Sequence, residues 1–248
     1  MPSKQELCEL LAGIPRPPPN STGFTTYLRN VLMRGVRYRP PAVVRTPSRR
    51  RRATAQRGLV LGRRLDTAFR NFAETGIAGS LTGIVSSVLR RRGITVASTQ
   101  PVVHDAVLRV KTAIDGVGVY TAGTVWVIEL KNTQHTLSEH RSLYDLPCPG
   151  NEYLCNGLRN TERVRHALQV GFGVHGLRKV YSGTIRGLVV VNCPDGAVGY
   201  SVDCAEYASP RHFPRASHIV GLQSGGTWDP LNAKLRRLVV GLGFPPAS

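Results

Sequence analysis

The stretch TAIDGVGVYTAGTVWVIELKNT, residues 112–133, decides the fold. Runs of β-branched residues stand on both sides of YTAG, whose glycine suits a hairpin turn. Glu129 and Lys131 lie two positions apart on the second run, and side chains two apart on a strand point to the same face. Asp115 ends the first run, and a hairpin brings it alongside them. We therefore expect two adjacent strands that gather three charged side chains in one place.

The flanking sequence extends these two strands into an α/β domain. Apolar residues recur at three- and four-residue spacing in the segments that we expect to be helices, 58–76, 80–93, 160–177 and 231–243. β-branched residues are concentrated in the expected strands, 94–103, 106–119, 124–133, 184–193 and 197–204. A chain of 248 residues with 41% hydrophobic content can bury one substantial core. The order of these segments predicts a single α/β domain with a mixed central β-sheet flanked by helices.

The chain is strongly basic. Lys and Arg number 33 and Asp and Glu 15, so the net charge is 33 − 15 = +18. A polyanion is the natural partner, and nucleic acid is favoured over a membrane because the basic residues recur along the chain without a long apolar run beside them. Charge alone also fits a histone-like packing protein. The sequence has no run of about 18 apolar residues of the kind that spans a membrane.

The first residues argue against a secretory or organellar address. Glu6 and Glu9 stand where a signal peptide has a basic start followed by an apolar stretch. The five cysteines are odd in number and widely spaced, which disfavours a disulfide framework, and they lack the tight spacing of structural zinc modules. We therefore expect a soluble intracellular protein with reduced thiols.

Proline and arginine dominate residues 14–57, and we expect this stretch to be an N-terminal arm. This places the start of the folded domain at residue 58, with 1–57 as the N-terminal segment and 58–248 as the domain. Within the arm, Arg49, Arg50, Arg51 and Arg52 form an unbroken run. Three readings remain open for this run: phosphate binding, a nuclear import signal, or a solvated tail.

The three charged residues of the hairpin suggest metal chemistry. Carboxylates on adjacent strands, Asp115 and Glu129, make a hard-oxygen site for Mg²⁺ or Mn²⁺, to which the Leu130 carbonyl adds a ligand. The Lys131 ammonium can orient or help to deprotonate an attacking water, or stabilise the charge that builds on phosphorus. The alternative is a surface hairpin whose Glu–Lys pair serves only solubility. The apolar flanks of WVIEL count against that reading, because a charged pair on an inner strand needs a reason.

These motifs resemble the PD-(D/E)XK nuclease superfamily, and the match covers much of residues 58–203. TAIDGV and VIELK are similar to its central pair of motifs. GRRLDTAF resembles the early helix of the family, with Asp66 at the acidic position, and Glu74 competes for that role. RVRHALQVGF resembles a later helix, with Gln169 in place and Phe172 where a hydroxyl is expected. The arrangement is also similar to exonuclease-like members encoded by large eukaryotic DNA viruses.

The resemblance implies a restriction-endonuclease-like core and a metal-dependent nuclease that acts on DNA rather than RNA. It makes Asp66, Asp115, Glu129, Lys131 and Gln169 the candidate catalytic residues, with Asp66 as a further metal ligand. A nuclear location, the host nucleus if the protein is viral, is the matching expectation.

Basic side chains around these motifs are the candidate contacts to nucleic acid. We expect this role for Arg49, Arg50, Arg51, Arg52, Arg63, Arg64, Arg165, His166 and the RRRG segment at 90–93. His104 and Asp105 are expected in a turn without a functional role. The main rival to a nuclease is a catalytically inactive nucleic-acid-binding or packaging protein on the same fold. Exonuclease or endonuclease action and the oligomeric state stay open.

Overall fold

The computed structural model describes residues 2–33, 49–120, 123–148 and 152–215, without the side chains of residues 49–55, 57 and 59. Five strands form the central sheet in the order β2 (Ile94–Thr99), β5 (Gly116–Tyr120), β6 (Val125–Asn132), β7 (Ile185–Cys193) and β8 (Gly196–Val202). β6 and β7 run parallel, whereas the other neighbours are antiparallel. The prediction of a mixed sheet is confirmed.

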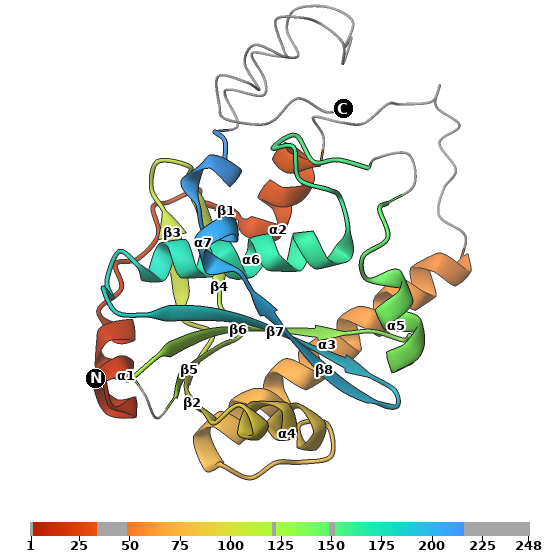
Figure 1. Cartoon of the computed structure of the whole chain (residues 1–248), viewed down its shortest axis with the longest axis horizontal. Coiled ribbons are helices and arrows are strands. Elements are labelled where there is room, and N and C mark those ends of the chain that lie inside the picture. Colours follow the sequence, from red (N-terminus) through yellow and green to blue (C-terminus); the bar gives the residue numbers. More distant parts are fainter. Residues whose placement is uncertain (1, 34–48, 121–122, 149–151, 216–248) are drawn as a thin grey trace, which may run out of the picture.

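Helices cover both faces of this sheet (Figure 1). α6 (Glu162–Leu177) connects β6 to β7 and packs on one face, and α3 (Arg49–Thr75) and α4 (Gly83–Arg91) pack on the other. Residues of β6 alternate between the two layers: Val125 and Val127 join the cluster of α6, whereas Trp126, Ile128 and Leu130 join the cluster of α3 and α4. This burial on both sides explains the continuous apolar run before Glu129.

A second sheet has three strands, two of which lie between β2 and β5 in the sequence. It contains β1 (Thr22–Gly23), β4 (Val110–Ala113) and β3 (Val102–Asp105) in that order. The expected strand over 94–103 is therefore two strands, which Pro101 separates, and the expected strand over 106–119 divides between Ala113 and Gly116. Proline cannot donate to a strand ladder, which accounts for the first break. The second break leaves Asp115 outside regular pairing, at the start of β5.

The expected arm is wrong for its first part. After α1 (Lys4–Ala12), the chain forms α2 (Phe24–Tyr27) and a π-helical turn (Leu28–Leu32). Five of these residues are buried and pack with side chains of α6 and with Phe213. Their three- and four-residue spacing was the signal of a core-facing helix. In addition, α3 begins at Arg49, nine residues before the predicted domain boundary.

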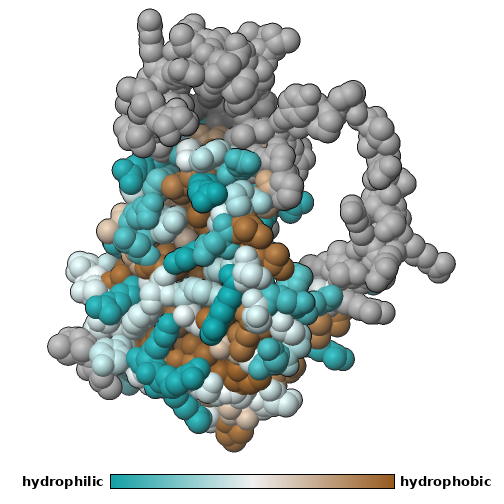
Figure 2. Space-filling view, turned by 45° about the vertical axis from the view of Figure 1, so that its right-hand side comes forward, coloured by the Kyte–Doolittle hydropathy of each residue, from teal (hydrophilic) through white to brown (hydrophobic). Residues whose placement is uncertain are grey.

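The polar stretch after β6 contains a further helix, α5 (Leu137–Leu143), which begins at a capping box of Thr136 and Glu139. The described chain ends with α7 (Cys204–Tyr207) and a short 3₁₀ turn (Pro210–His212). The helix expected over 231–243 lies outside the described residues. In the part of the chain that is described, no helix has the length and apolar character needed to cross a bilayer. Hydrophilic side chains alternate with smaller apolar patches on the face shown in Figure 2.

Candidate active site

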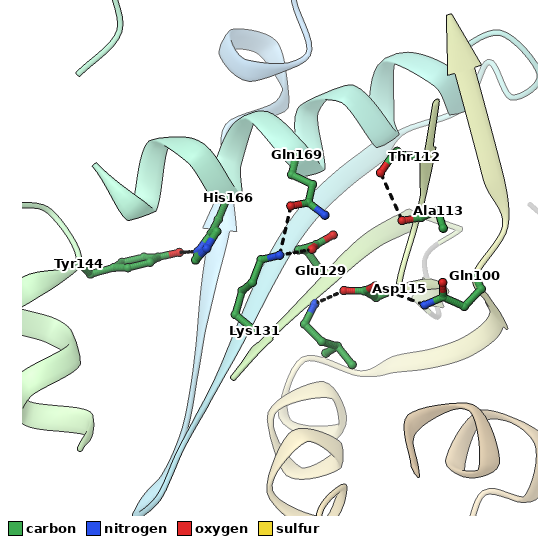
Figure 3. Close-up of polar contacts among 10 residues, drawn as sticks. Gln100, Thr112, Ala113, Asp115, Glu129, Lys131, Tyr144, His166 and Gln169 are labelled. Carbon is green, nitrogen blue, oxygen red and sulfur yellow. Dashed lines mark hydrogen bonds and ion pairs between the residues drawn. The ribbon is translucent and has the colours of Figure 1, made fainter. Parts of the chain in front are cut away.

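The register of β5 and β6 brings the three charged residues of the hairpin together. Gly116 pairs with Ile128, so Asp115 lies beside Glu129. The Leu130 N–H donates to Asp115 Oδ2 at 2.8 Å and fixes that carboxylate against β6. Glu129 and Lys131 share the face of β6 that α6 covers, as their spacing predicts, and Lys131 reaches Gln169 on that helix (Figure 3).

Glu129 is the most deeply placed of these groups, with only 4% of its surface exposed. Burial raises its pKa to about 8, the Lys131 ammonium opposes this change, and the nearby Asp115 carboxylate adds to it. Burial also raises the pKa of Asp115, which Lys131 and the Leu130 N–H partly offset. A buried carboxylate, Glu129, thus lies beside the half-buried carboxylate of Asp115, and the Lys131 ammonium contacts Glu129.

The Lys131 ammonium is held by two acceptors. It donates to Glu129 Oε1 and, at 3.1 Å, to Gln169 Oε1. Burial lowers its pKa, but the carboxylates of Glu129, Asp115 and Asp66 outweigh that effect and the net pKa is raised. A lysine that keeps its proton has no lone pair with which to accept another. Of the roles expected for Lys131, charge stabilisation is therefore favoured over deprotonation of water.

Asp66 approaches this cluster from α3. Its half-buried carboxylate has a pKa raised by burial and lowered by Lys131 and Arg70. Asp66 lines a groove together with Asp115 and Gln169, whereas its competitor Glu74 is exposed and does not line that groove. Of the two acidic residues on α3, Asp66 is the one that lies at the site.

The carboxylates suit a divalent cation held by two protein ligands. Mg²⁺ prefers oxygen donors and commonly takes only one or two carboxylates from a protein, with waters completing its shell. Asp115 and Glu129 provide such a pair. Among the described residues, no group of three or more His, Cys, Asp or Glu is arranged to hold a metal, so Asp66 does not complete a three-residue set. The carbonyl of Leu130 as a ligand stays a prediction.

Gln100 is a site residue that the sequence did not reveal. It lies at the bend between β2 and β3 with φ 58°, a left-handed conformation that non-glycine residues rarely adopt. From there its Nε2 donates to Asp115 Oδ1 at 3.3 Å. Together with the Leu130 N–H, Gln100 therefore holds both oxygens of Asp115. Backbone strain of this kind is concentrated at functional sites.

His166 lies on α6 one turn before Gln169, within electrostatic range of Lys131. Its Nδ1 is 3.0 Å from the Tyr144 hydroxyl (Figure 3). Burial and the Lys131 charge hold the pKa of His166 well below its usual range, and burial raises the pKa of Tyr144. In a neutral ring, Nδ1 accepts from the Tyr144 hydroxyl when the ring proton is on Nε2, and donates to it when the proton is on Nδ1. Tyr144 thus supplies a hydroxyl group next to His166. Phe172, which stands where the family resemblance implies a hydroxyl, has none.

The expected nucleic-acid contacts divide into three groups. Arg63, Arg64, Arg90 and Arg91 are exposed on α3 and α4. Arg165 instead donates to the Thr161 carbonyl and to Cys148 Sγ, each at 3.3 Å, so it ties the helix start to the preceding loop. The side chains of Arg49 to Arg52 lie outside the described residues.

Asp105 is not the simple turn residue that we expected. It is buried and accepts from His175 Nε2 at 2.9 Å and from Lys179 Nζ at 3.0 Å. These contacts connect β3 to the end of α6. They give Asp105 a structural role away from the groove.

Comparison with known proteins adds little to this geometry. No protein-family model matches the chain, and no curated protein matches it significantly. A solved crystal structure described as SSO0001 aligns with 98% of this chain and 93% of its own, at 16% sequence identity and a TM-score of 0.36. A TM-score at this level does not establish a shared fold.

Proposed function

We propose that this chain is a Mg²⁺- or Mn²⁺-dependent deoxyribonuclease on a restriction-endonuclease-like core. The observation that carries the proposal is the pair formed by buried Glu129 and half-buried Asp115, with the Lys131 ammonium bound to Glu129. Burial raises the pKa of both carboxyl groups, and the Asp115 carboxylate adds to the rise for Glu129. Carboxylates in such a pair are poised to share a cation, and perturbed groups of this kind are concentrated at functional sites.

Each side chain then has a distinct task. A bound divalent cation would supply Lewis-acid polarisation of the phosphate and an activated water. Asp115 and Glu129 would hold it, and Gln100 and the Leu130 N–H keep the Asp115 oxygens in place. Lys131, oriented by Gln169, stabilises the negative charge that develops on phosphorus. Asp66 lies on the outer side of the site, where it lines the groove beside Asp115.

DNA as the partner rests on charge and on the resemblance to PD-(D/E)XK nucleases. The net charge of +18 supplies a sequence-independent attraction to phosphates, and the exposed Arg63 and Arg64 lie on the helix that carries Asp66. A nuclear location belongs to the same proposal and depends on the run at residues 49–52. Removing that run should abolish nuclear accumulation, and an unchanged distribution in cells would count against it.

A catalytically inactive DNA-binding or packaging protein is the second candidate, because the same net charge favours it. The set of Asp115, Glu129 and Lys131 favours the nuclease over this candidate, since DNA binding alone does not need a buried Glu129 beside a second carboxylate. Burying a carboxyl group beside a second one costs stability.

The test uses the purified full chain with linear and circular DNA in Mg²⁺ or Mn²⁺. A Glu129→Ala/Lys131→Ala double variant serves as the control, and DNA binding by both proteins is measured in parallel. We expect metal-dependent cleavage by the wild type alone. If both proteins are equally inert while both bind DNA, the inactive candidate holds. Comparison of the two substrates distinguishes exonuclease from endonuclease action.

A further inference from the structure

Two cations line the groove beside the candidate catalytic residues, and the nuclease proposal gives neither of them a task. The groove has a volume of about 650 Å³, and Asp66, Asp115 and Gln169 are among its lining residues. Lys111 of β4 and Arg16, which follows α1, line it as well. Positive charge and candidate metal ligands therefore face one space.

Lys111 is half-buried and has no acidic partner among the described residues. Its neighbours in β4, Val110 and Thr112, are buried, so alternation along the strand directs the Lys111 side chain to the opposite side. An ammonium that loses part of its hydration without gaining a partner costs free energy, and an anion in the groove would offset that cost. The surroundings of Lys111 therefore favour a bound anion.

The chain itself sets the place of Lys111 relative to Asp115, the candidate metal ligand. The two residues are four positions apart, and four residues of fully extended chain span at most about 14 Å. Asp115 is in turn held in place by the Leu130 N–H and by Gln100. A chain of phosphates that meets Asp115 can therefore reach Lys111 within a few nucleotides.

The segment that carries Arg16 is stiff. Arg16 stands between Pro15 and Pro17 and is exposed. Proline fixes its own φ and disfavours the helical conformation of the residue before it, so few backbone conformations are open to this part of the chain. A side chain on a stiff segment loses less conformational entropy when it binds. Like Lys111, Arg16 forms no ion pair within the described part of the chain.

We propose that Arg16 and Lys111 are positioning residues that bind backbone phosphates of DNA in the groove beside Asp115. The inference rests on the proposed function for the choice of DNA as the anion. Arg and Lys donate charge-assisted hydrogen bonds to phosphate oxygens, and such contacts fix a protein on DNA without reading its sequence. Phosphates lie on the outside of a duplex, so these contacts need no opening of the strands. Lys131 differs from both cations, because it is already bound to Glu129.

Fluorescence anisotropy in EDTA tests the proposal, with the purified full chain and a labelled DNA duplex. The groove variant is Arg16→Gln/Lys111→Gln. Its control, Lys4→Gln/Arg141→Gln, also removes one lysine and one arginine, from exposed positions that do not line the groove. We expect the groove variant to bind about 10-fold more weakly than the control. The slope of log affinity against log salt should be smaller than that of the control by about 1.8, for two lost phosphate contacts.

Equal affinity of the groove and control variants for the duplex would overturn the proposal. Arg16→Lys/Lys111→Arg keeps both charges and should bind as tightly as the control; if it binds as weakly as the groove variant, the loss does not come from charge and the proposal also fails. The assay needs no cleavage, so the two proposals can fail separately. Weaker binding by the groove variant, beside a wild type that never cleaves, would keep these contacts and remove the nuclease. Cleavage by the wild type, with equal binding by the two variants, would do the reverse.

Discussion

The residues of the site differ in how well the sequence reveals them. Glu129 and Lys131 could be placed on one face of β6 because side chains alternate along a strand, and Asp115 could be placed beside them because a hairpin pairs its ends. Gln100 and Tyr144 could not be predicted. Gln100 reaches Asp115 from a strained bend, and Tyr144 reaches His166 from the end of α5. Both contacts depend on tertiary placement, which has no local sequence signal.

The raised pKa of Glu129 predicts how stability changes with pH in the metal-free protein. Its pKa is about 8 in the folded chain against an ordinary value of 4.5, so the folded state retains a proton that the unfolded state has released. This contribution to the free energy of unfolding is complete below pH 4.5 and is lost as the pH rises through about 8. Each unit between the two pKa values corresponds to about 1.4 kcal/mol.

Urea unfolding in EDTA between pH 6 and 9 measures this effect. The wild type should lose stability as the pH rises, and Glu129→Gln, which has no proton to release, should lose distinctly less. Other titrating groups are common to both proteins and cancel in the difference. Parallel stability curves would contradict the assignment of the raised pKa to Glu129.

Tyr144→Phe tests the charge and the tautomer of His166. We expect the wild-type ring to stay neutral, because its pKa lies well below the usual range. We predict that its proton is on Nε2, so that Nδ1 accepts from the Tyr144 hydroxyl. Removal of the hydroxyl should cost about 1 kcal/mol of unfolding free energy and release the fixed tautomer. Nitrogen-15 NMR of the His166 ring reports both properties. The exposed Tyr153→Phe is the control, and a His166 that titrates near pH 6.5 in the wild type would refute the assignment.

At the scale of elements, periodicity predicted α6 and the strands β6, β7 and β8 because each is long and strongly patterned. Thr161 caps α6 through a hydrogen bond from the Val164 N–H. The sequence failed where elements are short or shared: β2 and β3 were merged, and α2 was taken for part of an arm. The secondary structure of these short elements depends on the residues that they pack against rather than on the local preference of their own sequence.

The close packing of α6 against α7 yields a prediction for Gly171. A Cβ at this position would lie 2.1 Å from the Tyr207 carbonyl oxygen, which belongs to the backbone and cannot turn aside. Gly171→Ala should therefore destabilise the fold by about 1–3 kcal/mol. Gly62→Ala on α3, where a Cβ meets nothing within 4 Å, should instead be neutral or stabilising by up to about 1 kcal/mol. Thermal or urea unfolding distinguishes them, and equal effects would show that the α6–α7 contact is absent.

At the scale of the whole molecule, the N-terminal residues belong to the folded core. Phe24 is 2% exposed and stacks near Phe172 of α6, with ring centroids 4.9 Å apart. The proline and arginine residues of the same segment led us to predict an arm, because composition averages over a window that contains these residues together with the buried apolar ones. The same segment contributes Arg16 to the groove, so removing it would affect the site as well as the core.

Phe24→Ala should accordingly cost about 3–5 kcal/mol of unfolding free energy, the usual range for a buried aromatic side chain. Tyr153→Ala is the matched exposed aromatic and should change stability little, because its side chain is 48% exposed. Denaturant unfolding of the full chain compares the two variants. A Phe24→Ala protein as stable as the wild type would mean that the segment around Phe24 is an arm outside the folded core.

The most direct measurement of the central claim is the Mg²⁺-dependent rate of phosphodiester hydrolysis in the wild type, Glu129→Gln and Lys131→Met, at DNA concentrations that saturate all three. Glu129→Gln keeps the shape of the side chain but removes the carboxylate that we propose as a metal ligand. Lys131→Met keeps the length of the side chain but removes the charge that we propose stabilises the transition state. We predict metal-dependent cleavage by the wild type and rates at least about 100-fold lower in both variants. Cleavage that persists in both, or a wild type that binds DNA and never cleaves it in Mg²⁺ or Mn²⁺, would contradict the account.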